Sequence, residues 1–378
     1  MLSSFVPDAP YVLDLRDRGL GRRQGPRAAA SEPHADQPVP TVLALSRAAD
    51  EELHVVQDLL GRVGIPVLCL DAEMASSSNL LIDLHTKTVR LGGCLIRPTV
   101  AWIRHFSTRA IPDSSGNAVL RTLVQDSWQA IAQQVTVISA ASVAADNLGL
   151  LTQLDIARAS GIKVPRTVVT GDLQAAYDFF PRERVVVKVV GHHFVEARAG
   201  LLSGVFPKIM ATAELMRMRH PPRLPLMVQE FIEHDAEIRA YYVAGEIICF
   251  LVKKNDPADI WIQPGRVEVR QLPSSAAIRS ATERLARSMR LSYAAFDFLE
   301  KDGALTFLEA NPDGDCRWLE IRLDTTAVTL SVARMIRDIH LRHLHLPCPP
   351  AWKGAAREID LVSFLSGQPA GDNTNRAG

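Results

Sequence analysis

The last third of the chain contains the pattern that most constrains its fold: two apolar segments that carry acidic residues and are joined by a short turn. The first spans residues 292–299 and contains Asp297, and the second spans residues 305–310 and contains Glu309. The Lys-Asp-Gly sequence at 301–303 lies between them, and Asp-Gly supplies the left-handed backbone that tight turns need. We therefore predict a β-hairpin over these residues.

The polar residues of this hairpin indicate a metal site. Side chains alternate between the two faces of a strand, so Glu309 and Asn311 point the same way. A two-residue turn would set Asp297 opposite Leu308, so we predict an odd-numbered loop or a bulge near Gly303 that brings all three polar residues to one face. Two carboxylates and an amide oxygen suit Mg²⁺. The alternative is that both acids are strand-end residues that face solvent.

Further charged residues follow in a defined order along the chain. Lys188 lies in an apolar strand, where its ammonium favours an anion such as a nucleotide phosphate unless it reaches out to solvent. Gln-Glu-Phe-Ile occupies residues 229–232, and two lysines occupy residues 253–254. Glu237 and Arg239 share a strand face by alternation, and arginine suits bidentate contact with phosphate or carboxylate. Each feature alone fits an ordinary surface charge, but their order is informative.

This order resembles the ATP-grasp superfamily over residues 146–344, above all in the Asp-Phe and Phe-Leu-Glu-Ala-Asn-Pro-Asp-Gly parts of the hairpin. Within the superfamily, three stretches are most like the ligases that modify ribosomal peptides, the microviridin or graspetide type. They are Thr-Val-Ala-Trp-Ile-Arg from residue 99, Asn-Leu-Gly-Leu-Leu-Thr-Gln-Leu from residue 147 and Asn-Pro-Asp-Gly-Asp-Cys-Arg-Trp-Leu-Glu from residue 311. Ribosomal-protein glutamate ligases and glutathione synthetases resemble the chain less closely.

The resemblance implies a role for each of these residues. The implied cofactor-binding set is Lys188 on the ATP phosphates, a hinge of Gln229, Glu230, Phe231 and Ile232 whose backbone reads adenine, and Glu237 near the ribose or the substrate. The implied metal set is Asp297, Glu309 and Asn311 around two Mg²⁺ ions. The implied catalytic set is Arg239 and Lys253 at the γ-phosphate and activated carboxylate, and Arg317 at the acceptor carboxylate. Leu148 replaces a second phosphate lysine, for which Lys163 is the candidate substitute.

The resemblance also implies an α/β fold of the α+β kind, in which an N-terminal α/β domain precedes two β-rich lobes with ATP between them. The expected divisions are a flexible arm (1–38), a substrate-side α/β domain (39–145), a central lobe (146–225), a C-terminal lobe with the metal site (226–350) and a tail (351–378). The arm is predicted from its mixed Pro, Gly, Arg and Ala composition. Four strands are expected between residues 226 and 262.

Composition excludes several other classes. Lys plus Arg equals Asp plus Glu at 42 each, which argues against a dedicated nucleic-acid or membrane-surface protein. The chain lacks GxxxxGK[ST], GxGxxG, HExxH and GxSxG, so a P-loop NTPase, Rossmann dehydrogenase, zincin or α/β-hydrolase is not expected. Early acids do not fit a secretory signal, and five widely spaced cysteines fit reduced thiols. We expect a cytoplasmic protein without a transmembrane helix.

We therefore predict an ATP-dependent ligase that phosphorylates Asp or Glu side chains of a ribosomal precursor peptide and joins them to Lys, Ser or Thr as amides or esters. Two alternatives stay open: a ligase of the same fold that acts on a free amino acid or small-molecule carboxylate, and a non-catalytic peptide-binding module. The expected ligands and partners are ATP, Mg²⁺ and a precursor peptide with leader recognition, without nucleic acid or membrane. A homodimer is compatible with the resemblance.

Overall fold

The computed structural model describes residues 11–14, 37–77, 80–91, 93–107, 109–111, 118–132, 136–138, 148–191, 194–198, 200–217 and 225–348. These residues divide into two units, which are described separately. The first unit contains residues 11–14, 148–314 and 321–324, and the second contains residues 37–138, 315–320 and 325–348, with the gaps named above.

This division differs from the expected one. The two lobes expected over 146–225 and 226–350 belong to one unit, but the segment after residue 314 largely belongs to the other. Helix α10 (Ala327–His343) packs on strands of the second unit, because its buried face meets the sheet built by the N-terminal part of the chain. The first half of the chain and its last described helix therefore form one unit.

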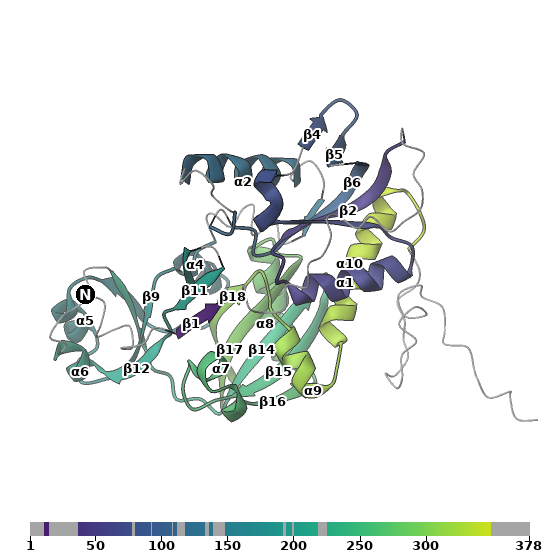
Figure 1. Ribbon diagram of the computed structural model, residues 1–378. Coiled ribbons are helices and arrows are strands. Elements are labelled where there is room, and N and C mark those ends of the chain that lie inside the picture. Colours follow the sequence, from purple (N-terminus) through teal and green to yellow (C-terminus); the bar gives the residue numbers. More distant parts are fainter. Residues whose placement is uncertain are drawn as a thin grey trace, which may run out of the picture. The chain divides into compact units, whose positions relative to one another are not determined.

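An antiparallel sheet of order β16-β15-β14-β17-β18 forms the main part of the first unit. Its strands are β14 (Ala236–Val243), β15 (Glu246–Lys253), β16 (Glu268–Leu272), β17 (Tyr293–Lys301) and β18 (Ala304–Asn311). Helices α4 (Leu150–Ala159) and α8 (Ala276–Ser288) cover one face of this sheet (Figure 1). Phe296, Phe298 and Phe307 are fully buried against them, so this face is the hydrophobic core.

A second, four-stranded antiparallel sheet of the same unit carries the predicted strand lysine. Its order is β12-β9-β13-β8. The strands are β8 (Thr167–Thr170), β9 (Arg184–Val189), β12 (Lys208–Ala211) and β13 (Leu226–Glu230), and two short helices, α5 (Leu173–Phe179) and α6 (Thr212–Met216), accompany them. Phe180, Val187 and Val228 form the centre of its core.

A short strand near the N-terminus corrects the prediction that residues 1–38 form a flexible arm. Strand β1 (Tyr11–Asp14) pairs antiparallel with β11 (Leu201–Gly204), and β10 (Phe194–Arg198) pairs with the other edge of β11. An added edge strand is held by main-chain hydrogen bonds, which composition does not reveal. The predicted residues 1–10 and 15–36 of the arm lie outside the described residues, as does the predicted tail 351–378.

Residues 226–262 also differ from expectation. Three of the four expected strands are present there as β13, β14 and β15, but Asp259–Ile262 forms the short helix α7. A 3₁₀ turn, η3 (Pro264–Arg266), follows, and the next strand of the sheet is β16. Apolar residues such as Trp261 and Ile262 do not distinguish a strand from one helical turn, because the segment is too short for periodicity.

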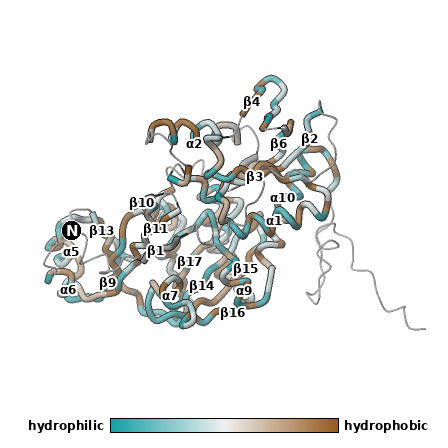
Figure 2. Tube along the Cα trace, viewed as in Figure 1, coloured by the Kyte–Doolittle hydropathy of each residue, from teal (hydrophilic) through white to brown (hydrophobic). Residues whose placement is uncertain are grey.

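The second unit contains a mixed sheet of order β3-β2-β6-β5-β4, in which β7 also pairs with β6. Strands β2 (Val39–Ser46), β3 (Val67–Asp71), β6 (Cys94–Ile103) and β7 (Thr136–Ile138) are parallel, and β4 (Leu80–Asp83) and β5 (Thr88–Leu91) add an antiparallel edge. The sheet is accompanied by α1 (Glu51–Arg62), η1 (Ala72–Ser77), α2 (Ala118–Ala132) and α10, and helix α9 (Arg317–Leu323) is divided between the units. Figure 2 shows brown, hydrophobic tube around β2 and β3.

The predicted N-terminal α/β unit is thus present, with β2, α1 and β3 as its opening β-α-β element. Asp50 caps α1, because its carboxylate accepts the backbone N–H of Leu53 at 3.1 Å. Within the described residues, no helix combines the length and apolar character needed to cross a bilayer.

Replacing Gly303 with alanine should lower the free energy of unfolding by about 1 kcal/mol or more, because its φ of +76° lies in the left-handed region. Gly265→Ala is the matched control in the same unit, since Gly265 has no left-handed φ and no atom lies within 4 Å of an added Cβ. That change should stay within about 0.5 kcal/mol. Urea unfolding measures both variants, and equal effects would contradict the left-handed hairpin turn.

Candidate active site

A row of charged residues crosses the face of the five-stranded sheet that lies opposite the phenylalanine core. Arg239 on β14 lies opposite Asp297 on β17, and Asp297 lies opposite Glu309 on β18. Paired residues of an antiparallel ladder share a face, so all three side chains lie on the face away from the phenylalanine core. The predicted meeting of Asp297 with Glu309 is therefore present.

A bulge makes this register possible, as predicted, but it lies further from the turn. The hairpin keeps a two-residue tip at Asp302 and Gly303, both with positive φ. The ladder is regular from Ala304 to Phe307 and then shifts, so Leu308 is the extra residue between the pairs Phe298–Phe307 and Asp297–Glu309. A residue inserted in the strand, rather than a longer loop, aligns the two carboxylates.

Asp297 and Arg239 form an ion pair at the centre of the row. The guanidinium Nη1 of Arg239 lies 3.1 Å from Oδ2 and 3.3 Å from Oδ1 of Asp297. Burial raises the pKa of the Asp297 carboxyl to about 6, and Glu309 adds to the rise, whereas Arg239 opposes it. Burial thus penalises the negative charge of Asp297 unless cations lie nearby.

Lys188 supplies a further cation from the four-stranded sheet. It lies on β9 and is 6% exposed, so its ammonium does not reach solvent. Burial lowers the pKa of Lys188, while the carboxylates of Glu309 and Asp297 raise it and favour the charged form. The structure therefore brings the predicted phosphate lysine to the predicted metal residues.

Glu237 belongs to a second polar group on the same sheet face. Its carboxylate forms an ion pair with the Nζ of Lys254, and its other oxygen lies 3.6 Å from Nε2 of His234. Burial raises the pKa of Glu237, but the contacts with His234 and Lys254 outweigh burial and hold the pKa below its usual value. Glu237 is therefore a charged member of the site.

Lys253 is not brought together with these groups. It is exposed at the end of β15 opposite Glu268 of β16, and alternation places it on the face of Ile238 rather than of Glu237. Lys254, the next residue, lies on the site's side instead. The structure thus places Lys254, not Lys253, beside Glu237, and the predicted role of Lys253 at the γ-phosphate stays a prediction. The strand register, which decides between two adjacent lysines, is not visible in the sequence.

The predicted hinge connects the two sheets of the first unit. Gln229 is buried and its amide donates to Thr167 Oγ1 at 2.9 Å, which ties β13 to β8. The carboxylate of Glu230 accepts the backbone N–H and the Nε of Arg166, both at 2.9 Å. These ion-paired contacts hold the side chain of Glu230 on the strand edge, so only its backbone remains for ligand recognition.

The backbone of the hinge is partly engaged as well. The N–H of Glu230 donates to Arg166 O, and the N–H of Phe231 donates to Arg184 O, each at 3.0 Å. The guanidinium of Arg184 also lies 4.0 Å from the ring centroid of Phe231. Within the described residues no backbone carbonyl accepts the N–H of Ile232. Among the hinge residues, Ile232 thus differs from Glu230 and Phe231, and the reading of adenine by the hinge backbone stays a prediction.

Asn311 ends β18 and closes the turn that follows it. Its Oδ1 accepts the backbone N–H of Asp313 and of Gly314, both at 3.1 Å. The amide oxygen thus holds the turn, and the part of Asn311 in a metal site stays a prediction. Lys163 lies beside β18, where its carbonyl accepts the N–H of Phe307 at 2.8 Å. Burial raises the pKa of Glu230, but the contacts with Arg166, together with a smaller effect of the Lys163 charge, hold it below its usual value.

Gln153 is a residue of this site that sequence reasoning missed. It is buried on α4, and its amide bonds both backbone groups of Ala310, with Nε2 donating to the carbonyl at 3.0 Å and Oε1 accepting the N–H at 2.7 Å. Ala310 separates Glu309 from Asn311, so Gln153 fixes the backbone between two predicted metal residues. A buried glutamine in an amphipathic helix was the available signal.

Arg317 belongs to the second unit, and its contacts there are defined. Its backbone N–H donates to Glu52 Oε1 at 2.9 Å, and its Nη1 donates to Glu320 Oε2 at 3.0 Å. The Glu320 carboxylate is fully buried and also accepts from Thr329. These contacts account for Arg317 as part of the framework of its own unit, and its predicted role at an acceptor carboxylate stays a prediction.

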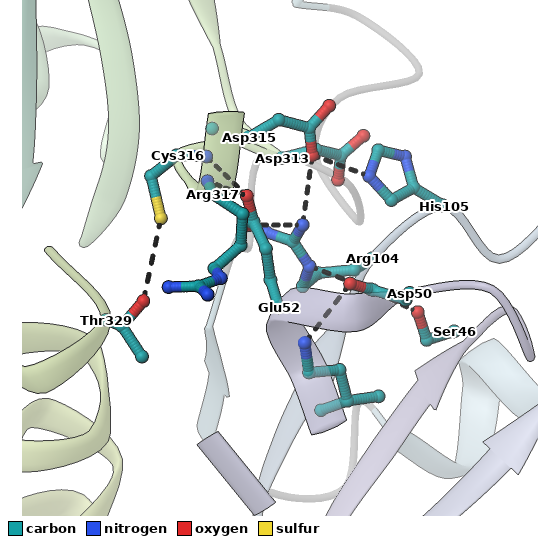
Figure 3. Close-up of polar contacts among 12 residues, drawn as sticks. Ser46, Asp50, Glu52, Arg104, His105, Asp313, Asp315, Cys316, Arg317 and Thr329 are labelled. Carbon is teal, nitrogen blue, oxygen red and sulfur yellow. Dashed lines mark hydrogen bonds and ion pairs between the residues drawn. The ribbon is translucent and has the colours of Figure 1, made fainter. Parts of the chain in front are cut away.

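Arg104 organises the surroundings of Arg317 (Figure 3). Its guanidinium is 1% exposed and bonds Asp50 at 2.9 Å, Glu52 at 2.7 Å and Asp315 at 3.0 Å. Burial raises the pKa of Glu52 to about 6, and Arg104 opposes this rise. Three carboxylates from two distant parts of the sequence, residues 50–52 and residue 315, therefore converge on the arginine of the Trp-Ile-Arg stretch.

The donor set on this charged sheet face suits a hard cation. Asp297 and Glu309 are Cα partners in the ladder, and like charges directly opposite one another destabilise a sheet. Carboxylate oxygens are the ligands that Mg²⁺ prefers. Among the described residues, no three His, Cys, Asp or Glu side chains gather to hold a metal by themselves, so Mg²⁺ here needs oxygen ligands beyond the two carboxylates.

Comparison with known proteins identifies the fold. No protein-family model and no curated protein matches the chain. Solved structures do match, among them the macrocyclase MdnC bound with precursor peptide MdnA from Microcystis aeruginosa MRC, with a TM-score of 0.65, 16% identity and coverage of 79% of this chain and 99% of that chain. The Chryseobacterium gregarium RiPP-associated ATP-grasp ligase in complex with ADP and a leader and core peptide has a TM-score of 0.66, 16% identity and coverage of 79% and 97%.

A third similar structure is the ATP-grasp ligase PsnB complexed with a phosphomimetic variant of its minimal precursor, Mg and ADP. Its TM-score is 0.63 at 15% identity, with coverage of 80% of this chain and 99% of that chain. At this identity the likeness bears on the fold, which agrees with the one that the hairpin motif predicts. The chain therefore has the ATP-grasp fold.

Proposed function

We propose that this protein is an ATP-dependent carboxylate ligase that acts on a ribosomally made precursor peptide. The observation that carries the proposal is the convergence of buried Lys188 on the carboxylates of Asp297 and Glu309, on a fold shared with peptide ligases. Similar structures contain precursor peptides, ADP and Mg, which supports a peptide, ATP and Mg²⁺ as ligands here. A cytoplasmic location follows from the need for ATP.

The proposed reaction has two steps. An Asp or Glu carboxylate oxygen of the peptide attacks the γ-phosphorus of ATP, and ADP leaves. A Lys amine or a Ser or Thr hydroxyl then attacks the acyl carbon, phosphate leaves with the electron pair of the broken C–O bond, and the nucleophile gives up one proton. The products are an amide or ester, ADP and phosphate.

The residues of the first unit have different roles in this reaction. Lys188 holds the phosphates by charge-assisted hydrogen bonds, and Ile232 donates to the base. Asp297 and Glu309 would hold Mg²⁺, with Asn311 as a further ligand. When bound, Mg²⁺ neutralises the charge that develops on the transferred phosphoryl group. Arg239 orients the phosphoryl and acyl groups from the same sheet face, and Glu237 with Lys254 contacts the ribose or the substrate.

Substrate-dependent release of ADP tests the proposal directly. The protein with Mg²⁺, ATP and acidic peptides that also contain Lys, Ser or Thr should release ADP and lose one water mass per bond formed in the peptide. Lys188→Ala is the control, because loss of a charge-assisted contact of about 1.5–3 kcal/mol should weaken ATP binding at least tenfold. ADP release only with free amino acids would favour the small-molecule ligase, and no release with any carboxylate would reject the function.

Glu309→Gln should abolish ligation while the chain stays folded. The amide keeps the shape of the side chain and removes the repulsion between Glu309 and Asp297, so the melting temperature without ligand should equal or exceed that of the parent. ADP release should fall by about 100-fold or more, because the cation that stabilises the transferred phosphoryl group loses a charged ligand. A variant that unfolds while its folded fraction keeps full activity would show that Glu309 is only structural.

Lys254→Ala should lower the rate of ADP release about tenfold, because Glu237 loses a charge-assisted partner worth roughly 1.5–3 kcal/mol. Lys253→Ala is the matched control, since that side chain is exposed and lies on the opposite face. Steady-state kinetics of both variants with the same peptide make the comparison. A larger loss in the Lys253 variant would contradict the placement of Lys254 at the site.

A further inference from the structure

The turn after β18, Asn311 to Gly314, is held from two sides. From within, Oδ1 of Asn311 accepts the N–H groups of Asp313 and Gly314, both at 3.1 Å. From outside, the hydroxyl of Tyr293, which is 1% exposed, donates to the carbonyl of Gly314 at 2.8 Å. Two independent groups therefore hold one turn.

Gly314 is fitted closely to Tyr293. Its φ of +58° lies in the left-handed region, and a Cβ at this position would lie 2.8 Å from the hydroxyl oxygen and 2.9 Å from Cζ of Tyr293. Any side chain larger than hydrogen would push the tyrosine away from the turn. The contact between the ring and the turn is thus a packed contact as well as a hydrogen bond.

The backbone on the other side of Asn311 is fixed too. Gln153 bonds both backbone groups of Ala310, at 3.0 and 2.7 Å. Asn311 therefore lies between two backbone positions that other side chains hold: Gln153 holds Ala310, and Tyr293 holds Gly314. Its own side chain can turn without releasing either position.

The amide oxygen of Asn311 has two lone pairs, and the turn uses both of them. Coordination of a metal ion would require the oxygen to leave at least one N–H group. A turn that depended on Asn311 alone would then open, and the free energy of opening it would weaken the binding of the metal ion. The bond from Tyr293 does not involve the Asn311 side chain.

We propose that Tyr293 is a positioning residue that keeps this turn closed while the amide oxygen of Asn311 exchanges the backbone N–H groups for Mg²⁺ beside Asp297 and Glu309. The inference rests on the proposed function, because it needs a metal ion at these carboxylates. It assigns Tyr293 no contact with ATP, peptide or metal.

A double-mutant cycle between Tyr293→Phe and Asn311→Ala tests the inference, and Tyr242→Phe, on the helix-covered face of the same sheet, is the matched control. Calorimetry measures ADP binding as a function of Mg²⁺ concentration. Tyr293→Phe should raise the Mg²⁺ concentration for half-maximal binding about 5- to 10-fold, the worth of one hydrogen bond. In the Asn311→Ala background it should add no further shift, and Tyr242→Phe should have no effect.

Urea unfolding of the metal-free variants gives a second readout. Because either group alone holds the turn, each single variant should raise the unfolding equilibrium constant only slightly. The double variant should raise it by a larger factor than the two single factors multiplied together. Multiplicative effects, or a Tyr293→Phe shift in Mg²⁺ dependence that persists without Asn311, would overturn the inference. A parent protein that binds ADP equally with and without Mg²⁺ would reject the proposed function and the exchange of partners, whereas Mg²⁺-dependent binding unaffected by Tyr293→Phe would reject the exchange alone.

Discussion

Asp297 and Glu309 lie directly opposite one another on neighbouring strands, and the repulsion between them governs the composition of the surrounding face. Arg239 pairs with Asp297, Lys188 contributes positive charge from another sheet, and Lys254 pairs with the next acid along β14. Each cation is itself largely buried, so each depends on the carboxylates as much as they depend on it. Mutually dependent buried charges are costly to assemble without a ligand, and this cost supports the proposal that ligands bind at this face.

The opposite face of the sheet makes that assembly possible. Phe296, Phe298 and Phe307 alternate with the charged residues along β17 and β18 and are fully buried under α4 and α8. Burial of three aromatic side chains stabilises the hairpin by several kcal/mol, on the order of 1.5–3 kcal/mol each. Because side chains alternate along a strand, the side that faces the helices stabilises the fold. The opposite side can then carry charged residues whose burial is unfavourable.

Local patterns allowed the hairpin, its shared face and the buried lysine to be predicted, because alternation and turn chemistry depend on neighbours in the sequence. The same alternation predicts a bulge, but it does not fix the position of the bulge at Leu308, five residues beyond Gly303. The choice between Lys253 and Lys254 depends on where β15 ends relative to its partners. Local sequence patterns also do not predict contacts between distant segments. The hydrogen bonds of Gln153 with Ala310 and of Glu52 with Arg317 are examples.

Strand β1 has a consequence for how the chain acquires its structure. Its partner β11 lies in the middle of the sequence, so residues Tyr11–Asp14 leave the ribosome long before the residues that hold them. The parallel strands β2, β3 and β6 of the other unit are synthesised in between. Pairing over so long a loop is slow compared with local structure. The first strand that the structure describes is therefore expected to pair late, after local structure has formed around its partner.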